Sequence, residues 1–448
     1  MRKQYMRRLI KGPCVLLLSL LCLSSATMAQ DTLTVEKAIA TALDNNYDIL
    51  LSKEDSASAA INYEYRNAVF LPTLNASSTV LFTKNSQRSK FTDGTERKRT
   101  GLKATNVNAA LNLNWTLFDG LRMFILRDRF DVTIMQGSLT IRNQVVNTVS
   151  DVIKTYFDIV RQRQLLKNIE EQMTFSSDRL RLAQYKLDIG VGVRPDVLQA
   201  QIDYNAQRAA QINQLSIIDQ RKQELNRLMN VPHNVNYQVV DTIIARPDLI
   251  LGGLLNNISE TSPVLQLART NVDVARLDVR EARALRYPTL SLVSAYSFSR
   301  NNNNSVVNPV AQPLFSQNRG LNYGLTATIP IFNRFSVRQQ IRQAELAVEY
   351  RQLQYENQQS IINTDILNNY RAYLAQREIV GINDSSVVLA RENLTIERER
   401  YRLGATTFIE LRQAEENLAN AVTESITTRY NLKIAETELL RLHGDLVR

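Results

Sequence analysis

Cysteine is almost absent from this sequence of 448 residues. Its two cysteines, Cys14 and Cys22, both precede position 30. Neither follows a small residue, as the acceptor cysteine of a lipoprotein would. If the first residues are removed on export, the remaining chain has no disulfide, no thiolate metal ligand and no cysteine nucleophile. Its stability must then come from packing.

Histidine is equally scarce, with His233 and His443 as the only two. The sequence also lacks a glycine-rich phosphate loop, a metal-spaced cluster and a nucleophilic serine elbow. These absences exclude the common catalytic and cofactor-binding patterns. We therefore predict a protein that is not an enzyme and that has no cofactor, no metal and no catalytic residue.

Glycine and proline are few, with 14 and 10 residues respectively. Residues 121–189 contain no proline and one glycine, and residues 334–403 repeat this composition. Either stretch would form a helix on the order of 100 Å long at about 1.5 Å per residue. Helices of this length imply a coiled coil or a helical barrel. A heptad row near the C-terminus supports this packing, and its leucines are Leu411, Leu418, Leu432 and Leu439.

The N-terminus has the pattern of an export signal. Five cations precede a short apolar run, Val15 to Leu23, and small residues precede Gln30. The run is too short to span a bilayer. We predict that residues 1–29 are a signal peptide, with a retained N-terminal anchor as the alternative.

The net charge of +10 is concentrated in two places. Five cations lie in the predicted signal, and the segment from Lys84 to Lys103 holds seven cations against Asp93 and Glu96. The rest of the chain is close to neutral. A local basic segment on an exported protein favours anionic lipid headgroups or plain solvation over nucleic acid.

The chain contains an internal duplication. Phe70-Leu71-Pro72-Thr73-Leu74 recurs in the second half as Arg286-Tyr287-Pro288-Thr289-Leu290. At nearly the same interval, Leu117-Phe118-Asp119 recurs as Ile331-Phe332-Asn333, and Gly190 recurs as Gly404. We predict repeat one at 30–230, an inter-repeat segment at 231–260, and repeat two with a C-terminal tail at 261–448.

Each repeat also contains two segments with alternating polarity. The clearest run from Val107 to Leu117 and from Leu321 to Ile331, and weaker partners span 74–84 and 290–300. Alternation with a period of two indicates a strand with one apolar face. Such strands, joined by polar connectors at 85–104 and 301–320, are typical of outer-membrane barrels. A soluble sandwich is the alternative for these segments taken alone.

Four strands of this type cannot close a barrel. Open sheet edges are not tolerated in lipid, because each unpaired backbone group costs several kcal/mol. Two copies would give eight strands and three would give twelve. A barrel of about eight strands is filled by its own side chains, so a conducting pore favours a trimer or a larger assembly.

Three stretches resemble the TolC-like outer-membrane efflux family. They are Leu33 to Asn46, Ser262 to Leu292, and Tyr401 to Thr407 with Leu411 and Ala414. The resemblance implies a mainly α-helical homotrimer, with a periplasmic α-barrel of long coiled-coil helices and four strands per protomer in a twelve-stranded membrane β-barrel. It further implies a location in the outer membrane extending into the periplasm. The partners would be lipid, a periplasmic adaptor and an inner-membrane pump, with the channel as a passive exit duct for efflux or type I secretion.

The resemblance also assigns site residues. The helix tips that contact the adaptor would include Gly190, Val191, Gly192, Val193, Gly404 and Ala405. The periplasmic gate would include Glu410. From the internal repeat, Asp196 at the equivalent place in repeat one would contribute further acids, and Tyr401 would brace the helix on the other side of the turn. The family's second acid, three residues after Glu410, is replaced by Gln413. The alternative for Glu410 is a residue that merely favours a helix N-terminus.

Aromatic residues cluster where helices and strands are predicted to meet. Such residues form a girdle at the membrane interface of barrels, with ordinary core packing as the alternative. The predicted interface residues are Phe70, Trp115, Phe118, Tyr287 and Phe332.

One other function remains open at this point, a periplasmic adaptor or coiled-coil scaffold. Such a protein would also be exported and helical, but it would need no membrane strands. The sequence does not identify the transported substrate.

Overall fold

The computed structural model describes residues 32–446 except positions 93, 234, 236, 241, 247, 309 and 311. The predicted signal peptide, residues 1–29, lies outside this part of the chain. The chain forms two compact units. The helical unit comprises the segment up to Asn46, Thr148–Asp248 and Tyr370–Glu438. The sheet unit comprises Tyr47–Asn147, Leu249–Asn369 and the residues from Leu439 onward. Each unit takes segments from both sequence repeats.

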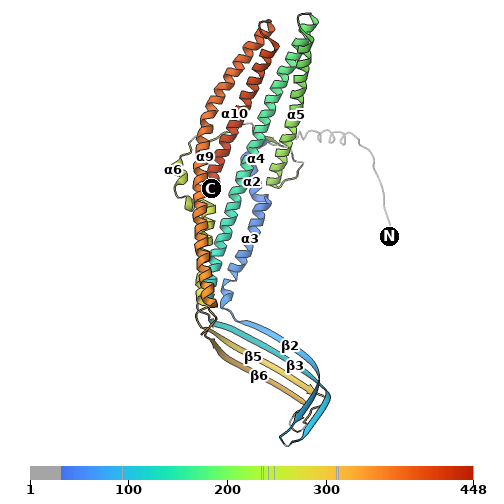
Figure 1. The fold of residues 1–448 in the computed structure, drawn as a ribbon, viewed down its shortest axis with the longest axis vertical. Helices are drawn as coiled ribbons and strands as arrows, with labels where there is room; N and C mark the ends of the chain where they lie inside the picture. Colours follow the sequence, from blue (N-terminus) through green and yellow to red (C-terminus); the bar gives the residue numbers. More distant parts are fainter. Residues whose placement is uncertain are drawn as a thin grey trace, which may run out of the picture. The chain divides into compact units, whose positions relative to one another are not determined.

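The sheet unit is built on four antiparallel strands in the order β2-β3-β5-β6 (Figure 1). Their bounds are β2 Thr73–Lys90, β3 Glu96–Phe118, β5 Thr289–Asn303 and β6 Phe315–Thr328. The helices of this unit are α3 Tyr47–Glu64, η1 Arg66–Phe70, α6 Leu251–Leu255, α7 Ile258–Thr261 and α8 Pro263–Ala284. The first parts of α4 (Arg122–Asp188) and α9 (Ser336–Arg402) complete it.

The strands differ from the prediction at their ends. The predicted connector 85–104 is mostly strand, because β2 continues to Lys90 and β3 begins at Glu96. The predicted connector 301–320 is also partly strand, since β5 reaches Asn303 and β6 begins at Phe315. The residues in these parts are mostly polar, so they show no alternation of apolar and polar side chains. The backbone hydrogen bonds between the strands nevertheless continue. Strand β6 ends at Thr328 rather than Ile331, and Pro330, which has no N–H to donate to a ladder, lies two residues further on.

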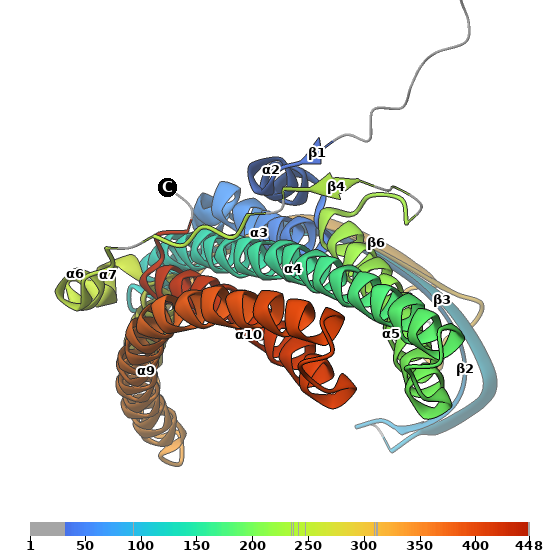
Figure 2. The same cartoon turned by 90° about the horizontal axis from the view of Figure 1, so that it is seen from above.

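The helical unit consists mainly of two helix pairs, α4 with α5 (Arg194–Met229) and α9 with α10 (Phe408–His443) (Figure 2). It also holds α2 (Val35–Asn45) and the parallel pair β1 (Thr32–Leu33) and β4 (Gln238–Val239). Buried residues of α4, α5 and α2 form one core. At its centre the Tyr156 hydroxyl donates to the Leu33 carbonyl at 2.8 Å. Three heptad leucines, Leu411, Leu418 and Leu439, are buried, and Leu432 is half-buried.

The long helices repeat at the interval seen in the sequence. Helices α4 and α9 are each 67 residues long, and α5 and α10 are each 36. The interval from the start of α4 to that of α9 equals the interval from the start of α5 to that of α10. Asp119 accepts a hydrogen bond from the Met123 amide at 3.2 Å and so satisfies one free donor at the start of α4. No helix in the described residues is both long and apolar enough to cross a bilayer.

Candidate functional surfaces

The strand register determines which side chains of the sheet share a face. Residues directly opposite each other on neighbouring strands point to the same side. One set, here called the apolar face, is largely hydrophobic on all four strands. Its members are Leu74, Ala76, Val80 and Phe82 of β2, Val107, Ala109, Leu111, Leu113 and Trp115 of β3, Leu290, Leu292, Tyr296 and Phe298 of β5, and Leu321, Tyr323, Leu325 and Ala327 of β6.

Many side chains of the apolar face are exposed in the single chain. Phe82 is 77% exposed and Tyr323 is 81% exposed. The opposite face is polar and includes Asn108, Asn112 and Asn322. A contiguous hydrophobic surface of this extent marks a lipid or protein contact. Apolar and polar residues thus alternate between the two faces along each strand.

The predicted interface aromatics lie at one end of the sheet. The Trp115 indole Nε1 donates to the Phe70 carbonyl at 2.8 Å, which joins strand β3 to η1. The Phe70 ring also packs against Phe124 of α4 at 5.1 Å. Phe118, Tyr287 and Phe332 are exposed at the same strand–helix junctions. Of the five residues, the structure brings Phe70 and Trp115 into direct contact.

The other end of the apolar face carries aromatic residues that the sequence analysis missed. The guanidinium of Arg300 lies 5.3 Å from the Phe315 ring centre, and that of Arg319 lies 5.4 Å from the Phe298 ring centre. Phe82 lies opposite Thr105 on the same face. These residues come together only through the pairing register of neighbouring strands. That register cannot be derived from the alternating pattern within a single strand.

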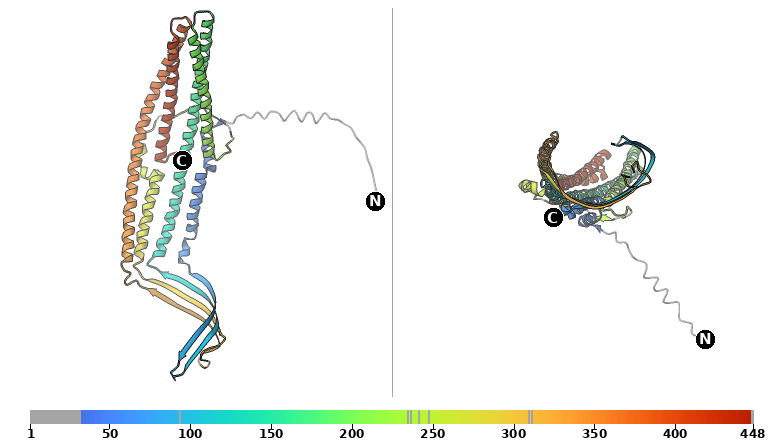
Figure 3. Two further views of the ribbon diagram at one scale, coloured as in Figure 1. Left: turned by 45° about the vertical axis from the view of Figure 1, so that its right-hand side comes forward. Right: turned by 90° about the horizontal axis from the view of Figure 1, so that it is seen from below.

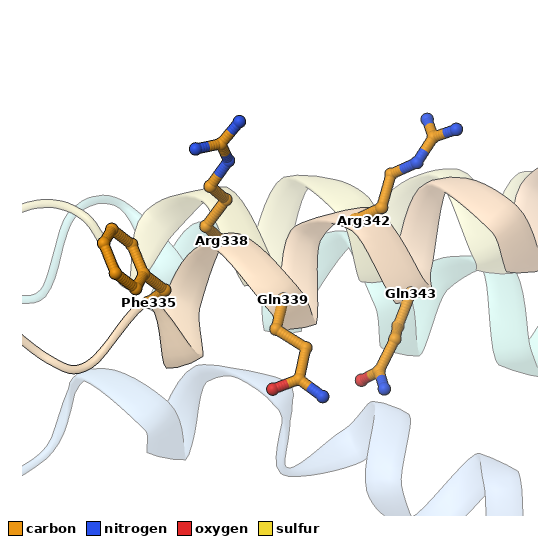
Figure 4. A pocket seen from close by; sticks show the side chains of 5 residues that line it. All are labelled: Phe335, Arg338, Gln339, Arg342 and Gln343. Atoms are coloured by element: carbon orange, nitrogen blue, oxygen red, sulfur yellow. The ribbon is translucent and has the colours of Figure 1, made fainter.

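A surface hollow of about 420 Å³ lies at the start of α9 (Figure 4). In Figure 4 the side chains of Arg338 and Arg342 point to one side of the helix, while Gln339 and Gln343 point to the other. The polar groups therefore diverge, and the hollow has no convergent ligand-binding geometry. The part of the chain that the structure describes also contains no group of three or more potential metal ligands.

At the tip of each helix pair, a glycine allows the chain to reverse. Gly190 has φ +79° and Gly404 has φ +76°, a left-handed conformation that L side chains rarely adopt. A Cβ on Gly192 would lie 2.8 Å from the Leu187 amide nitrogen, so this position requires glycine for steric reasons. Three of the six predicted docking residues are thus needed by the backbone itself.

Exposed apolar side chains surround these turns. Val191 is 72% exposed, and Val193 and Ala405 are also exposed, as the docking prediction requires. Leu403, which is 75% exposed, lies in the second predicted tip turn, at 403–408, and Ile409 just beyond that turn is exposed as well. Both residues flank the turn at Gly404, so the sequence alone could have indicated that they are exposed at the tip.

Glu410 occupies the N3 position of α10 and forms a capping box with Thr407. Its Oε2 accepts from the Thr407 amide at 2.7 Å and from the Thr406 and Thr407 hydroxyls at 2.6 and 2.9 Å. These hydrogen bonds, led by that from Thr406, lower the pKa of Glu410 to about 2. In the single chain this shift is opposite to the increase expected from crowded like charges.

Tyr401 is buried between the two turns. Its ring contacts Phe408 at 6.5 Å, and the Lys186 ammonium lies 3.8 Å from its ring centre. Burial raises the pKa of Tyr401, and the negative charge of Asp196 raises it further. Tyr401 therefore packs against Phe408, the first residue of α10. Among the described residues, no hydrogen bond or ion pair joins Asp196 to Glu410 or Tyr401.

A buried charge cluster near the tips links the two helix pairs and was not predicted. Arg179 of α4, only 4% exposed, donates to Glu415 of α10 and, at 2.6 Å, to Asp203 of α5. Arg412 also approaches Asp203 at 3.5 Å. Burial raises the pKa of Glu415 to about 7, against the opposing effects of Arg179 and Arg398. We call this group of charged residues the Arg179 cluster. It joins residues that are distant in the sequence.

A sheet with one apolar, exposed face, whose strands lead directly into helices of 67 residues, defines a protomer of an outer-membrane channel. The chain belongs to the outer membrane efflux protein family, whose profile matches residues 38–231 and 254–445.

Individual relatives agree with this assignment. The chain is 22% identical to the outer membrane protein TolC of Escherichia coli K12, over 78% of the chain and 72% of that protein. It is 20% identical to the outer membrane efflux protein BepC of Brucella suis, over 96% of the chain and 88% of that protein. The outer-membrane channel CmeC of Campylobacter jejuni superposes with a TM-score of 0.76 at 16% identity, over 99% of this chain and 94% of the other.

The family defines the function at a coarse level. The chain is an outer-membrane exit duct that extends into the periplasm, and it belongs to a family of channels rather than of enzymes. A periplasmic adaptor or scaffold is therefore not its function.

Proposed function

We propose that three copies of the chain form one continuous conduit, a twelve-stranded barrel followed by a helical tunnel. The observation that carries this proposal is the open sheet. Strands β2 and β6 each pair on one side only within the chain, while the apolar face between them is exposed. In lipid, both edges must pair with other copies. Three copies give twelve strands and leave a lumen, whereas two would give a filled barrel.

The conduit receives its substrate from an inner-membrane pump through a periplasmic adaptor. The exposed apolar residues at the helix tips support this role, because Val191, Val193 and Leu403 would otherwise contact water. The TolC of Escherichia coli and the proteases secretion protein PrtF of Dickeya chrysanthemi are both relatives of this chain. The duct therefore suits either efflux or protein secretion.

Glu410 forms the periplasmic gate in this proposal, with three symmetry copies near the axis and Asp196 adding acids to the same region. Crowding of the three carboxylates would raise their pKa values, while the capping hydrogen bonds lower them. The capping hydrogen bonds favour the ionised form of Glu410. Its Oε1 makes none of the capping contacts and is available to a cation.

Single-channel conductance in planar bilayers tests the gate. We expect Glu410→Gln to reduce block by divalent cations and to lower cation selectivity. The matched control is Glu416→Gln, which removes an acid from the same helix where the side chain pairs with Arg412. If Glu410→Gln conducts like the wild type on both measures, Glu410 serves only as a helix cap.

A further inference from the structure

The apolar face of the sheet ends in a row of cations at the end remote from the helices. Beyond Phe82 and Val107, the next large side chains on this face are Lys84 and Lys103, which lie directly opposite each other. On β5, Arg300 lies opposite Val107, and on β6, Arg319 lies opposite Phe298. All four strands thus contribute to what we call the cation row: Lys84, Lys103, Arg300 and Arg319.

The height of Lys84 and Lys103 matches the edge of a hydrocarbon layer. In the register, Arg300 is level with Val107 and Arg319 with Ala109, on the apolar side of that edge, and long arginine side chains can extend towards it. A strand that rises about 3.4 Å per residue and tilts by about 40° gains about 2.6 Å per residue along the barrel axis. The apolar stretch from Trp115 to Val107 then spans about 20 Å, close to the apolar band of about 25 Å in membrane barrels. By the same rise, Lys103 lies about 10 Å beyond Val107, at the level of lipid headgroups.

The charges of the row are not neutralised within the described part of the chain. Like charges directly opposite each other destabilise a sheet, and Lys84 and Lys103 form such a pair. No ion pair joins any of the four cations to an acid among the described residues. Arg300 and Arg319 lie over the rings of Phe315 and Phe298, which orients each guanidinium while its N–H groups remain available to an anion.

More positive charge lies farther out along the same two strands. Pairing of β3 with β5 ends at Ala104, so the distal parts of β2 and β3 project as a two-stranded hairpin (Figure 3). Its one described ion pair joins Arg88 to Glu96. The remaining cations there are Lys90, Arg97, Lys98 and Arg99.

We propose that the cation row binds the phosphate groups of the glycolipid that forms the outer leaflet of the outer membrane. This inference rests on the proposed barrel, in which the strand ends remote from the helices face the cell exterior. The row continues the lipid-facing surface, so its ligand must share that surface with acyl chains. A phosphorylated lipid meets this condition and nucleic acid does not. Lysine and arginine are the side chains that best bind phosphate.

Lipid binding to the detergent-solubilised protein, followed by native mass spectrometry, tests the proposal. The probes are bisphosphorylated lipid A and the same lipid after removal of its phosphates. We expect the wild type to bind the phosphorylated form at least tenfold more tightly, with the preference weakening as salt increases. The combined variant Lys84→Gln, Lys103→Gln, Arg300→Gln and Arg319→Gln should lose this preference. The control Lys53→Gln with Arg351→Gln removes two cations from exposed helix positions and should retain it.

Two results would overturn the inference: equal binding of both lipids by the wild type, or an unchanged preference in the combined variant. If the combined variant does not assemble, the phosphate and salt dependence of the wild type decides alone. Failure of the barrel itself has a different signature, because the protein would then be extracted without detergent and would bind neither lipid.

Discussion

At the scale of single residues, the Arg179 cluster has the clearest energetic consequence. Arg179 is held between two carboxylates from different helices and is almost fully buried. Removing one partner of a buried ion pair leaves an uncompensated charge and typically costs about 3–5 kcal/mol. The cluster therefore ties the two helix pairs of the helical unit together near their tips.

Glu415 makes the stability of the helical unit depend on pH. Because its pKa in the folded chain is raised from 4.5 to about 7, the folded state holds the proton more tightly than the unfolded state. This contribution is complete below about pH 4.5 and is lost as the pH rises through 7. We predict that, between pH 5 and 8, thermal stability declines more in the wild type than in Glu415→Gln. Glu416→Gln, the exposed neighbour, should follow the wild type, and parallel profiles for wild type and Glu415→Gln would contradict the assignment.

Sequence reasoning reached some of these residues and not others. The alternative stated for Glu410, a residue that favours a helix N-terminus, agrees with the hydrogen bond that it accepts from the Thr407 amide. The Arg179 cluster was out of reach, because its members lie 24 and 236 residues apart. No local pattern connects such positions before the helices are placed side by side.

At the scale of elements, the repeat predicted where the long helices begin, since both pairs keep the interval that separates Gly190 from Gly404. The strand ends were predicted less well. Apolar alternation reveals a strand only while one face is hydrophobic, and the distal parts of β2 and β3 are polar on both faces. The basic segment was therefore expected as a loop, although it is a hairpin.

Trp115 reports on the membrane depth of β3. Its indole donates to the Phe70 carbonyl, at the strand–helix junction. We predict that the fluorescence of this sole tryptophan is quenched by quenchers placed at the headgroup level of the bilayer. Quenching only by ions dissolved in water would place the junction outside the membrane.

The helix tips are the predicted contact surface for the adaptor. Val191→Asp adds charge to an exposed apolar side chain, without disturbing the glycine turns. It should reduce transport at least tenfold while the amount of trimer in the membrane stays the same. Val191→Thr, which keeps the shape of the side chain, is the matched control. Transport unchanged in Val191→Asp would place docking elsewhere.

Gly192→Ala provides a second comparison at the tips. The added methyl group meets the backbone of Lys186 and Leu187. This variant should lower the amount of trimer as well as transport. A distorted turn therefore lowers both trimer and transport, whereas a lost contact with the adaptor, as in Val191→Asp, lowers transport alone.

At the scale of the whole molecule, the central claim is that the chain is one third of a channel. Three observations support it: the edge strands β2 and β6 each pair on one side only within the chain, the apolar face is exposed, and the chain belongs to the outer membrane efflux protein family. The proposed gate and the proposed tip contacts both depend on this assembly.

The mass of the detergent-solubilised particle tests this claim most directly. Light scattering corrected for bound detergent should give three chains of 51.0 kDa each, less the mass of the predicted signal peptide. A monodisperse monomer, or a dimer that remains soluble without detergent, would contradict the account.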